Sequence, residues 1–180
     1  MSAARDGAAP QGDAVELCAF RVGDEEYVVD LRRVREILNA GPVTAVPRAP
    51  EGIEGVMNVR GNLIPVVDVR ERLAATPRPG SRAKVLVVEV AGRVLGLVVD
   101  GVVEVVRTRR SAIGPPPAAA AGARLFLGVC GARDGRPPST RFTTRPGRKL
   151  RLLLNVKALL EPGAPAHAAE TRRRASAGGA

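Results

Sequence analysis

Residues 55–69 read GVMNVRGNLIPVVDV, and they contain two short apolar runs that pivot on the tetrad NVRG at 58–61. Two apolar runs separated by a short turn that contains glycine are typical of a β-hairpin. Gly61 tolerates the positive φ of a tight turn, and such a turn would aim Arg60 outward. Pro65 has no backbone N–H, so the second run is expected at a sheet edge or at a bulge.

Apolar runs of the same kind continue on both sides of this stretch. One hairpin is predicted over residues 15–30 and another over 84–100, each with a glycine turn and a final aspartate. Their likeness suggests two similar lobes. Further strands are predicted at 102–109, 125–131 and 150–156. About ten closely spaced strands with few helices exclude a doubly wound parallel sheet. They favour small antiparallel barrels, because closure removes exposed strand edges.

Two short helices are expected beside the strands. Asp30 is well placed to cap a helix over 31–38 (LRRVREIL), in which Glu36 faces water or a partner. The apolar face of this helix would carry Leu31, Val34, Ile37 and Leu38. Residues 156–160 (VKALL) predict the other helix.

The expected organisation is one packed domain over residues 15–161, with two lobes joined by a Pro- and Gly-containing linker at 74–83. Lobe one is expected at about 15–75 and lobe two at about 84–150, with the 156–160 helix packing back on both. Three further segments are expected to lack stable packing. These are the N-terminus 1–14, an Arg-rich loop inserted at 132–149 and an Arg- and Ala-rich tail at 162–180.

The net charge of +10 is unevenly distributed along the chain. The 132–149 loop carries +5 and the 162–180 tail +2, whereas residues 1–14 carry −1 and the remainder +4. A solvated loop and tail explain this distribution better than a dedicated phosphate-binding patch. Three phenylalanines and one tyrosine are the only aromatic residues, which argues against a stacking platform for single-stranded nucleic acid. A small basic β-barrel that binds nucleic acid is kept as the alternative interpretation.

The sequence contains no constellation typical of an enzyme. It has no P-loop, no Rossmann glycine spacing and no Gly-x-Ser-x-Gly elbow, and its one histidine, His167, lies in the tail. Asp68 and Asp100 end apolar strands, where aspartate more often binds backbone N–H groups than catalyses a reaction. Cys18 and Cys130 form neither a disulfide nor a zinc pattern, so both are expected as reduced thiols in a cytosolic protein. We therefore expect no enzymatic activity, no metal and no cofactor.

The apolar stretch 85–106 does not predict a membrane span. It is interrupted by four charged residues and three glycines, which would be costly in lipid but fit the turns and edges of a hairpin. The N-terminal residues 1–13 have no apolar segment of the kind that a secretory signal needs.

Several motifs fall in one order along the chain. They are the GDEEY turn at 23–27, V-x-E-I/L at 34–38, Val46-Pro47-x-x-Pro50, the NVRG tetrad with IPVVDVR at 64–70, VLGLVVDGV at 94–102, Pro115-Pro116 and LLLNVKALL at 152–160. In this order, over roughly residues 15–161, the chain resembles the CheW adaptor family of bacterial chemotaxis systems.

The resemblance implies two five-stranded, SH3-like antiparallel β-barrel lobes with a groove between them. It also implies a cytoplasmic, non-enzymatic adaptor that couples the cytoplasmic tip of methyl-accepting chemoreceptors to the regulatory domain of a CheA-type histidine kinase. The positions that match partner-binding residues of the family are Asn58, Arg60, Gly61, Gly55, Val34, Glu36, Gly96 and Val105. Among them, Arg60 offers a permanently charged fork for carboxylates or helix carbonyls.

Three features depart from the family pattern. Val59 stands in the tetrad where leucine is commoner, and Asn155 ends a late strand where many members have aspartate. No acidic role is therefore placed at Asn155. The 132–149 loop is longer than the usual connection.

Overall fold

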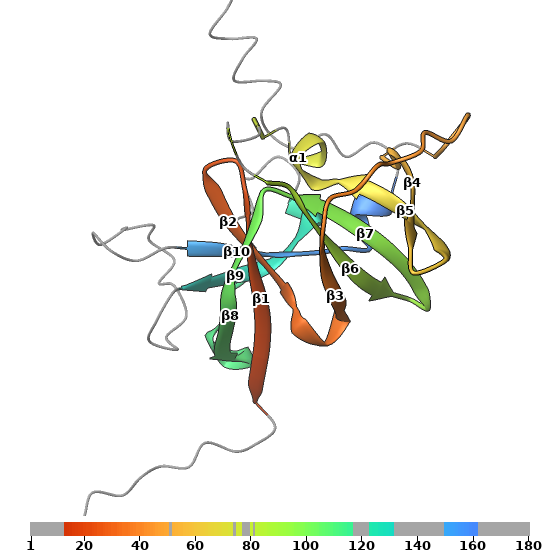
Figure 1. The fold of residues 1–180 in the computed structure, drawn as a ribbon. Coiled ribbons are helices and arrows are strands. Elements are labelled where there is room, and N and C mark those ends of the chain that lie inside the picture. Colours follow the sequence, from red (N-terminus) through yellow and green to blue (C-terminus); the bar gives the residue numbers. More distant parts are fainter. Residues whose placement is uncertain are drawn as a thin grey trace, which may run out of the picture.

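The computed structural model describes residues 13–50, 52–73, 75–76, 80, 82–116, 123–131 and 150–161. The expected tails and the 132–149 loop lie outside the described residues, apart from Asp13 and Ala14. No helix in this part of the chain has the length and apolar character needed to cross a membrane. The described strands form two five-stranded sheets (Figure 1).

The first sheet contains β1 (Ala14–Val22), β2 (Glu25–Asp30), β8 (Gly101–Arg109), β9 (Phe126–Gly131) and β10 (Leu150–Leu154). Its strand order is β8-β1-β2-β10-β9. The second sheet contains β3 (Val34–Asn39), β4 (Gly55–Val59), β5 (Asn62–Asp68), β6 (Lys84–Val90) and β7 (Arg93–Val99). Its order is β3-β6-β7-β5-β4. Short helical elements are α1 (Val69–Arg72) and the 3-10 turns η1 (Leu31–Arg33), η2 (Arg110–Ala112), η3 (Ala123–Leu125) and η4 (Ala158–Leu160).

The two sheets share one topology, as the likeness of the hairpins at 15–30 and 84–100 suggests. In the first sheet, strand β2 of the antiparallel β1–β2 hairpin pairs in parallel with β10. In the second sheet, strand β7 of the antiparallel β6–β7 hairpin pairs in parallel with β5. Beyond β8, Gly114 bridges to Val129 of β9, and beyond β3, Thr44 bridges to Val56 of β4. Each sheet therefore curls until the chain after one edge strand meets the opposite edge, which is the curvature that the expected barrels require.

Within the residues that the structure describes, buried apolar side chains form three clusters, and the largest contains residues of both sheets. We call it the shared cluster. On β6, Leu86 and Val88 belong to the shared cluster, whereas Val85 and Val87 belong to a cluster within the second sheet. A third cluster lies within the first sheet. Because both faces of β6 are buried, this strand is an almost continuous apolar run rather than an alternating one.

The helix expected over 31–38 is wrong. The chain forms η1 and then β3, which pairs antiparallel with β6. Asp30 does act as a cap, since its side chain accepts a hydrogen bond from the Arg32 N–H. A helix of eight residues is marginal on its own, whereas pairing with β6 satisfies the backbone of β3. Ile37, expected on a core face, is 44% exposed.

The expected lobe boundaries also differ from the strand pairing. β6 and β7 join β3, β4 and β5 in the second sheet, and β8, β9 and β10 return to the first. The lobes are therefore interleaved in the sequence rather than divided at 74–83. Pro65 lies in β5, which is an interior strand and not an edge. Its missing N–H is tolerated because the pairing of β5 with β7 begins only at Val66.

The C-terminal part of the domain ends in η4 rather than in a helix over 156–160. Ala158 and Leu159 of this turn are buried in the shared cluster, so the turn packs against side chains from both sheets.

Candidate partner-binding site

The tip of the β4–β5 hairpin is a two-residue turn between Val59 and Asn62. Arg60 has φ 52° and Gly61 has φ 88°, which are the positive values that a type I′ turn requires at both central positions. The Asn58 side-chain oxygen accepts a hydrogen bond of 2.8 Å from the Gly61 N–H and holds the turn closed. The turn therefore fixes the direction in which Arg60 leaves the sheet.

Glu36 of β3 orients the Arg60 side chain. Arg60 Nε and Nη2 lie 3.1 and 3.0 Å from the same oxygen, Oε2 of Glu36. The Arg60 side chain is 78% exposed and that of Glu36 27% exposed. An ion pair this exposed adds little to stability. The pair instead presents a guanidinium that is held in place but still open to a second carboxylate or to carbonyl oxygens.

Two exposed apolar side chains come from the strands that carry this pair. Leu63 lies opposite Asn58 in the hairpin and is 70% exposed. Ile37 follows Glu36 on β3 and pairs with Leu86 of the shared cluster, so it lies on the side of the second sheet that faces the first. Glu36 pairs with Val87 and Ile37 with Leu86, so these two side chains leave β3 on opposite faces. An oriented charge and exposed apolar side chains are the two kinds of group that a protein-binding surface combines.

Val105 lies on the other sheet. It is 49% exposed on β8, and it pairs with Cys18, whose side chain belongs to the shared cluster. Val105 and Ile37 therefore both border the region where the two sheets pack together. β8 is an edge strand, and Val102 and Val103 on it are also exposed.

The remaining residues that match family positions lie in tightly packed parts of the structure. Val34 is half-buried against the shared cluster. A Cβ on Gly55 would lie 2.3 Å from the Thr44 carbonyl oxygen, and a Cβ on Gly96 would lie 2.8 Å from Cγ1 of Val85. Thus the structure brings Asn58, Arg60, Gly61 and Glu36 together, leaves Val105 on another sheet, and places Gly55 and Gly96 where only glycine fits.

The sequence interpretation missed Ile37 and Leu63 as surface residues. Ile37 was assigned to the core because a 3.6-residue period was applied to a segment that is a strand. The pairing with β6 places Ile37 on the face that carries Leu86, opposite to the face of Glu36 and Leu38. Leu63 could have been assigned to the surface from its position close to the hairpin turn, in the residue after Asn62.

The strand-end aspartates bind backbone N–H groups, as the sequence indicates. Asp68 accepts a hydrogen bond of 2.8 Å from the Arg70 N–H, and Asp100 accepts one of 2.7 Å from the Gly23 N–H. Cys18 and Cys130 are free and buried, and burial raises the pKa of both thiols. Within the described ranges no three His, Cys, Asp or Glu side chains group in a way that could hold a metal ion.

Comparisons with known proteins agree on one family. The model of the CheW-like domain matches residues 16–162. A probable chemotaxis protein CheW of Rhizobium etli is 41% identical over 108 residues, which are 59% of this chain and 69% of that protein. The chemotaxis protein CheW of Rhizobium meliloti is 42% identical over 103 residues, 57% of this chain and 66% of its own length. The crystal structure of the scaffolding protein TtCheW from Thermoanaerobacter tengcongensis superposes with a TM-score of 0.69 at 25% identity, covering 91% of this chain and 97% of that one.

Proposed function

We propose, from the premise that this chain belongs to the CheW-like domain family, that it joins a chemoreceptor to a CheA-type histidine kinase. It is a chemotaxis coupling adaptor, as its similarity to the CheW proteins supports, rather than a nucleic-acid-binding barrel. An adaptor works by binding alone, so we expect no catalytic step, metal or cofactor. We expect the adaptor in the cytoplasm, where the receptor tip and the kinase that it would join are located.

The observation that best supports a receptor contact is the presentation of Arg60. A non-glycine residue at φ 52° is costly for the backbone, and the residue is exposed, so folding gains little from an arginine at this place. Glu36 holds the guanidinium in one direction. A chemoreceptor tip is a helical hairpin that offers carboxylates and helix carbonyls, and a preoriented arginine fork suits both.

We place the receptor contact on the surface formed by Arg60, Gly61, Asn58 and Glu36 with Ile37 and Leu63. Val34 packs against the shared cluster on the same side of β3 as Ile37, and we assign Val105 to the same contact from across the boundary between the sheets. Gly55 and Gly96 act through packing, since no side chain fits at either position. The kinase contact then lies on another face, as bridging requires both partners to bind at once.

The direct test of bridging is a three-component binding experiment. The purified chain is mixed with a receptor cytoplasmic hairpin fragment, with a CheA regulatory domain, and with both, and the complexes are separated by size-exclusion chromatography. We expect a ternary complex and no displacement of one partner by the other. Competition between the two partners would contradict the proposal. A steep salt dependence of binding to non-specific DNA would support the nucleic-acid alternative instead.

A further inference from the structure

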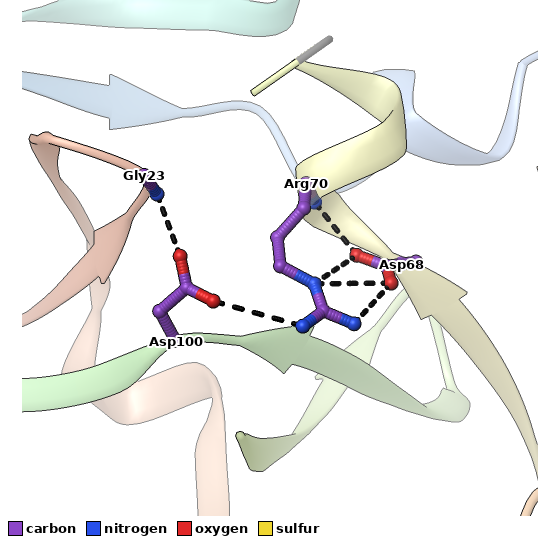
Figure 2. Close-up of polar contacts among 4 residues, drawn as sticks. All are labelled: Gly23, Asp68, Arg70 and Asp100. Atoms are coloured by element: carbon purple, nitrogen blue, oxygen red, sulfur yellow. Dashed lines mark hydrogen bonds and ion pairs between the residues drawn. The ribbon is translucent and has the colours of Figure 1, made fainter. Parts of the chain in front are cut away.

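A buried ionic network joins three segments that are distant in the sequence (Figure 2). Arg70 and Asp68 stand where β5 passes into α1. Asp100 stands between β7 and β8, where the chain leaves the second sheet for the first. Gly23 is in the turn of the β1–β2 hairpin of the first sheet. The network therefore lies at the point where the two sheets meet.

Arg70 is the centre of this network. Its Nη2 and Nε bind the Asp68 carboxylate, at 2.5 Å to Oδ2 and 2.9 Å to Oδ1. Its Nη1 lies 3.6 Å from Oδ1 of Asp100, and Oδ2 of Asp100 accepts the hydrogen bond from the Gly23 N–H. Figure 2 shows the guanidinium between the two carboxylates. One side chain thus connects the end of a strand of the second sheet to a turn of the first.

The Gly23 turn is fitted closely to the second sheet. A Cβ on Gly23 would lie 3.2 Å from the Thr76 carbonyl oxygen and 3.3 Å from Cβ of Ala75, in the segment after α1. The Asp100 N–H also donates to the Arg21 carbonyl, at 2.9 Å. The contact between hairpin and helix is therefore made by backbone packing as well as by charge.

The burial of these groups makes Arg70 important. The side chain of Asp100 is 1% exposed, that of Asp68 8% and that of Arg70 20%. Burial, followed by the charges of Asp68 and Glu71, raises the pKa of nearby Glu54, and the charge of Arg70 opposes that rise. Without Arg70, the guanidinium that joins the buried carboxylates of Asp68 and Asp100 is lost, and we expect the two sheets to be held together less firmly.

The chain contains a matched copy of the local part of this network. Asp30 and Arg32 end β2 with the same Asp-x-Arg spacing, and the Asp30 carboxylate binds the Arg32 N–H, Nε and Nη2. The Arg32 side chain is 74% exposed, and within the described part of the chain its ion pair is with Asp30. The two arginines therefore share the local contact with an aspartate, and they differ in burial and in that Arg70 reaches a second segment.

The network also lies at the ends of the strands that lead to the two parts of the proposed receptor surface. β5 runs from the Arg60 turn to Asp68, and β8, which carries Val105, begins directly after Asp100. We propose that Arg70 is a positioning residue that holds the two sheets in the relation in which the Arg60 and Val105 surfaces contact one partner together. The part of this proposal that concerns binding rests on the proposed function.

Spin labels test the positioning role without any partner. One label is placed at Leu127→Cys on β9 and the other at Arg93→Cys on β7, both exposed and outside the proposed surface. The native thiols are each 1% exposed, so they do not compete for the label. We expect a narrow distance distribution in the parent chain and in Arg32→Ala, and a broader or shifted one in Arg70→Ala. Asp100→Asn keeps an acceptor for the Gly23 N–H but removes the charge that Arg70 contacts. If Arg70→Ala does not fold, the distance distribution of Asp100→Asn tests the positioning role in its place.

Binding of a receptor hairpin fragment gives the second readout. Arg70→Ala should weaken binding by about tenfold although Arg70 does not touch the partner, whereas Arg32→Ala should leave it unchanged. Arg70→Lys, which keeps the charge, should recover part of the loss. An unchanged distance distribution in Asp100→Asn and in folded Arg70→Ala would overturn the positioning role. If the distances change but even the parent chain does not bind the fragment, it is the proposed function that fails.

Discussion

Arg60 stands in a backbone conformation that does not favour arginine. Asparagine and glycine are the residues that type I′ turns prefer, and Asn-Gly is the commonest pair. The β6–β7 hairpin provides a comparison within the same sheet, because its two-residue turn has Ala91 at φ 51° and Gly92 at φ 75°. The backbone cost is similar in the two turns, but only the β4–β5 turn carries a charge that Glu36 orients. This difference argues for a role of Arg60 outside folding.

The two turns give a matched pair of stability predictions. Ala91→Asn should raise the free energy of unfolding by about 0.5 kcal/mol, because asparagine tolerates the left-handed region. Arg60→Asn gains the same term but loses the ion pair with Glu36, which contributes less than about 1 kcal/mol at this exposure. Urea unfolding of both variants measures the difference. A loss above about 2 kcal/mol in Arg60→Asn alone would show that the arginine supports the fold.

Gly55 should be required for packing and not for contact with a partner. A Cβ at this position meets the Thr44 carbonyl at 2.3 Å, and backbone atoms cannot move aside easily. We expect Gly55→Ala to destabilise the protein by about 1–3 kcal/mol. Gly101→Ala is the control, because a Cβ there meets nothing within 4 Å. Normal stability of Gly55→Ala together with weak receptor binding would instead place Gly55 in the contact surface.

At the scale of single elements, the hairpins could be predicted from the sequence, but the pairing of distant strands with them could not. The turns at Gly23, Gly61 and Gly92 mark hairpins through local chemistry, and all three hairpins are present. β3 could not be recognised in the same way, because its partner β6 lies about 50 residues further on and no local signal announces the pairing. The Asp30 cap was correct, but it starts a three-residue turn rather than a helix.

One further element contact should be important for stability. Arg72 of α1 donates to the Leu159 carbonyl from Nε and Nη2, at 3.0 and 2.6 Å, and to the Glu161 carbonyl from Nη2 at 2.9 Å. Arg72→Met would leave these carbonyls without their donor, and we expect a loss of about 2–3 kcal/mol. Amide hydrogen exchange should also become faster in η4.

The control for this experiment is Arg35→Met, which removes an exposed ion pair with Glu89 within one sheet. It should change the free energy of unfolding by less than about 0.5 kcal/mol. Equal effects of the two substitutions would mean that Arg72 does not anchor the C-terminal turn.

At the scale of the whole molecule, the shared cluster makes the two sheets one unit. The sequence predicts two lobes of similar design, and the five-stranded sheets confirm this. It could not predict that the lobes are interleaved, because the parallel pairs β2–β10 and β5–β7 join segments with no local relation. The tetrad could be assigned to the surface, whereas the partnership of Arg60 with Glu36 required the structure.

The reactivity of the two cysteines measures whether the buried clusters unfold together. Cys18 lies in the shared cluster and Cys130 in the cluster of the first sheet, and burial raises the pKa of both thiols. The thiolate is the reactive form, so both should react slowly in the folded protein. In a urea series they should become reactive at one common midpoint, as measured by a thiol-specific dye and peptide mass mapping. Exposure of Cys130 at a lower urea concentration than Cys18 would show that the cluster within the first sheet opens before the shared cluster.

The central claim is that Arg60 binds the receptor and does not hold the fold together. The most direct measurement is a titration of a receptor hairpin fragment with the parent chain, Arg60→Asn and Ala91→Asn, with thermal melts of each. Arg60→Asn should weaken receptor binding by roughly 5- to 150-fold, the cost of removing one charge-assisted anchor from a small interface. Ala91→Asn should bind like the parent, and the affinity of Arg60→Asn for the kinase regulatory domain should change less. Unchanged receptor affinity of Arg60→Asn alongside a normal melt would contradict the account.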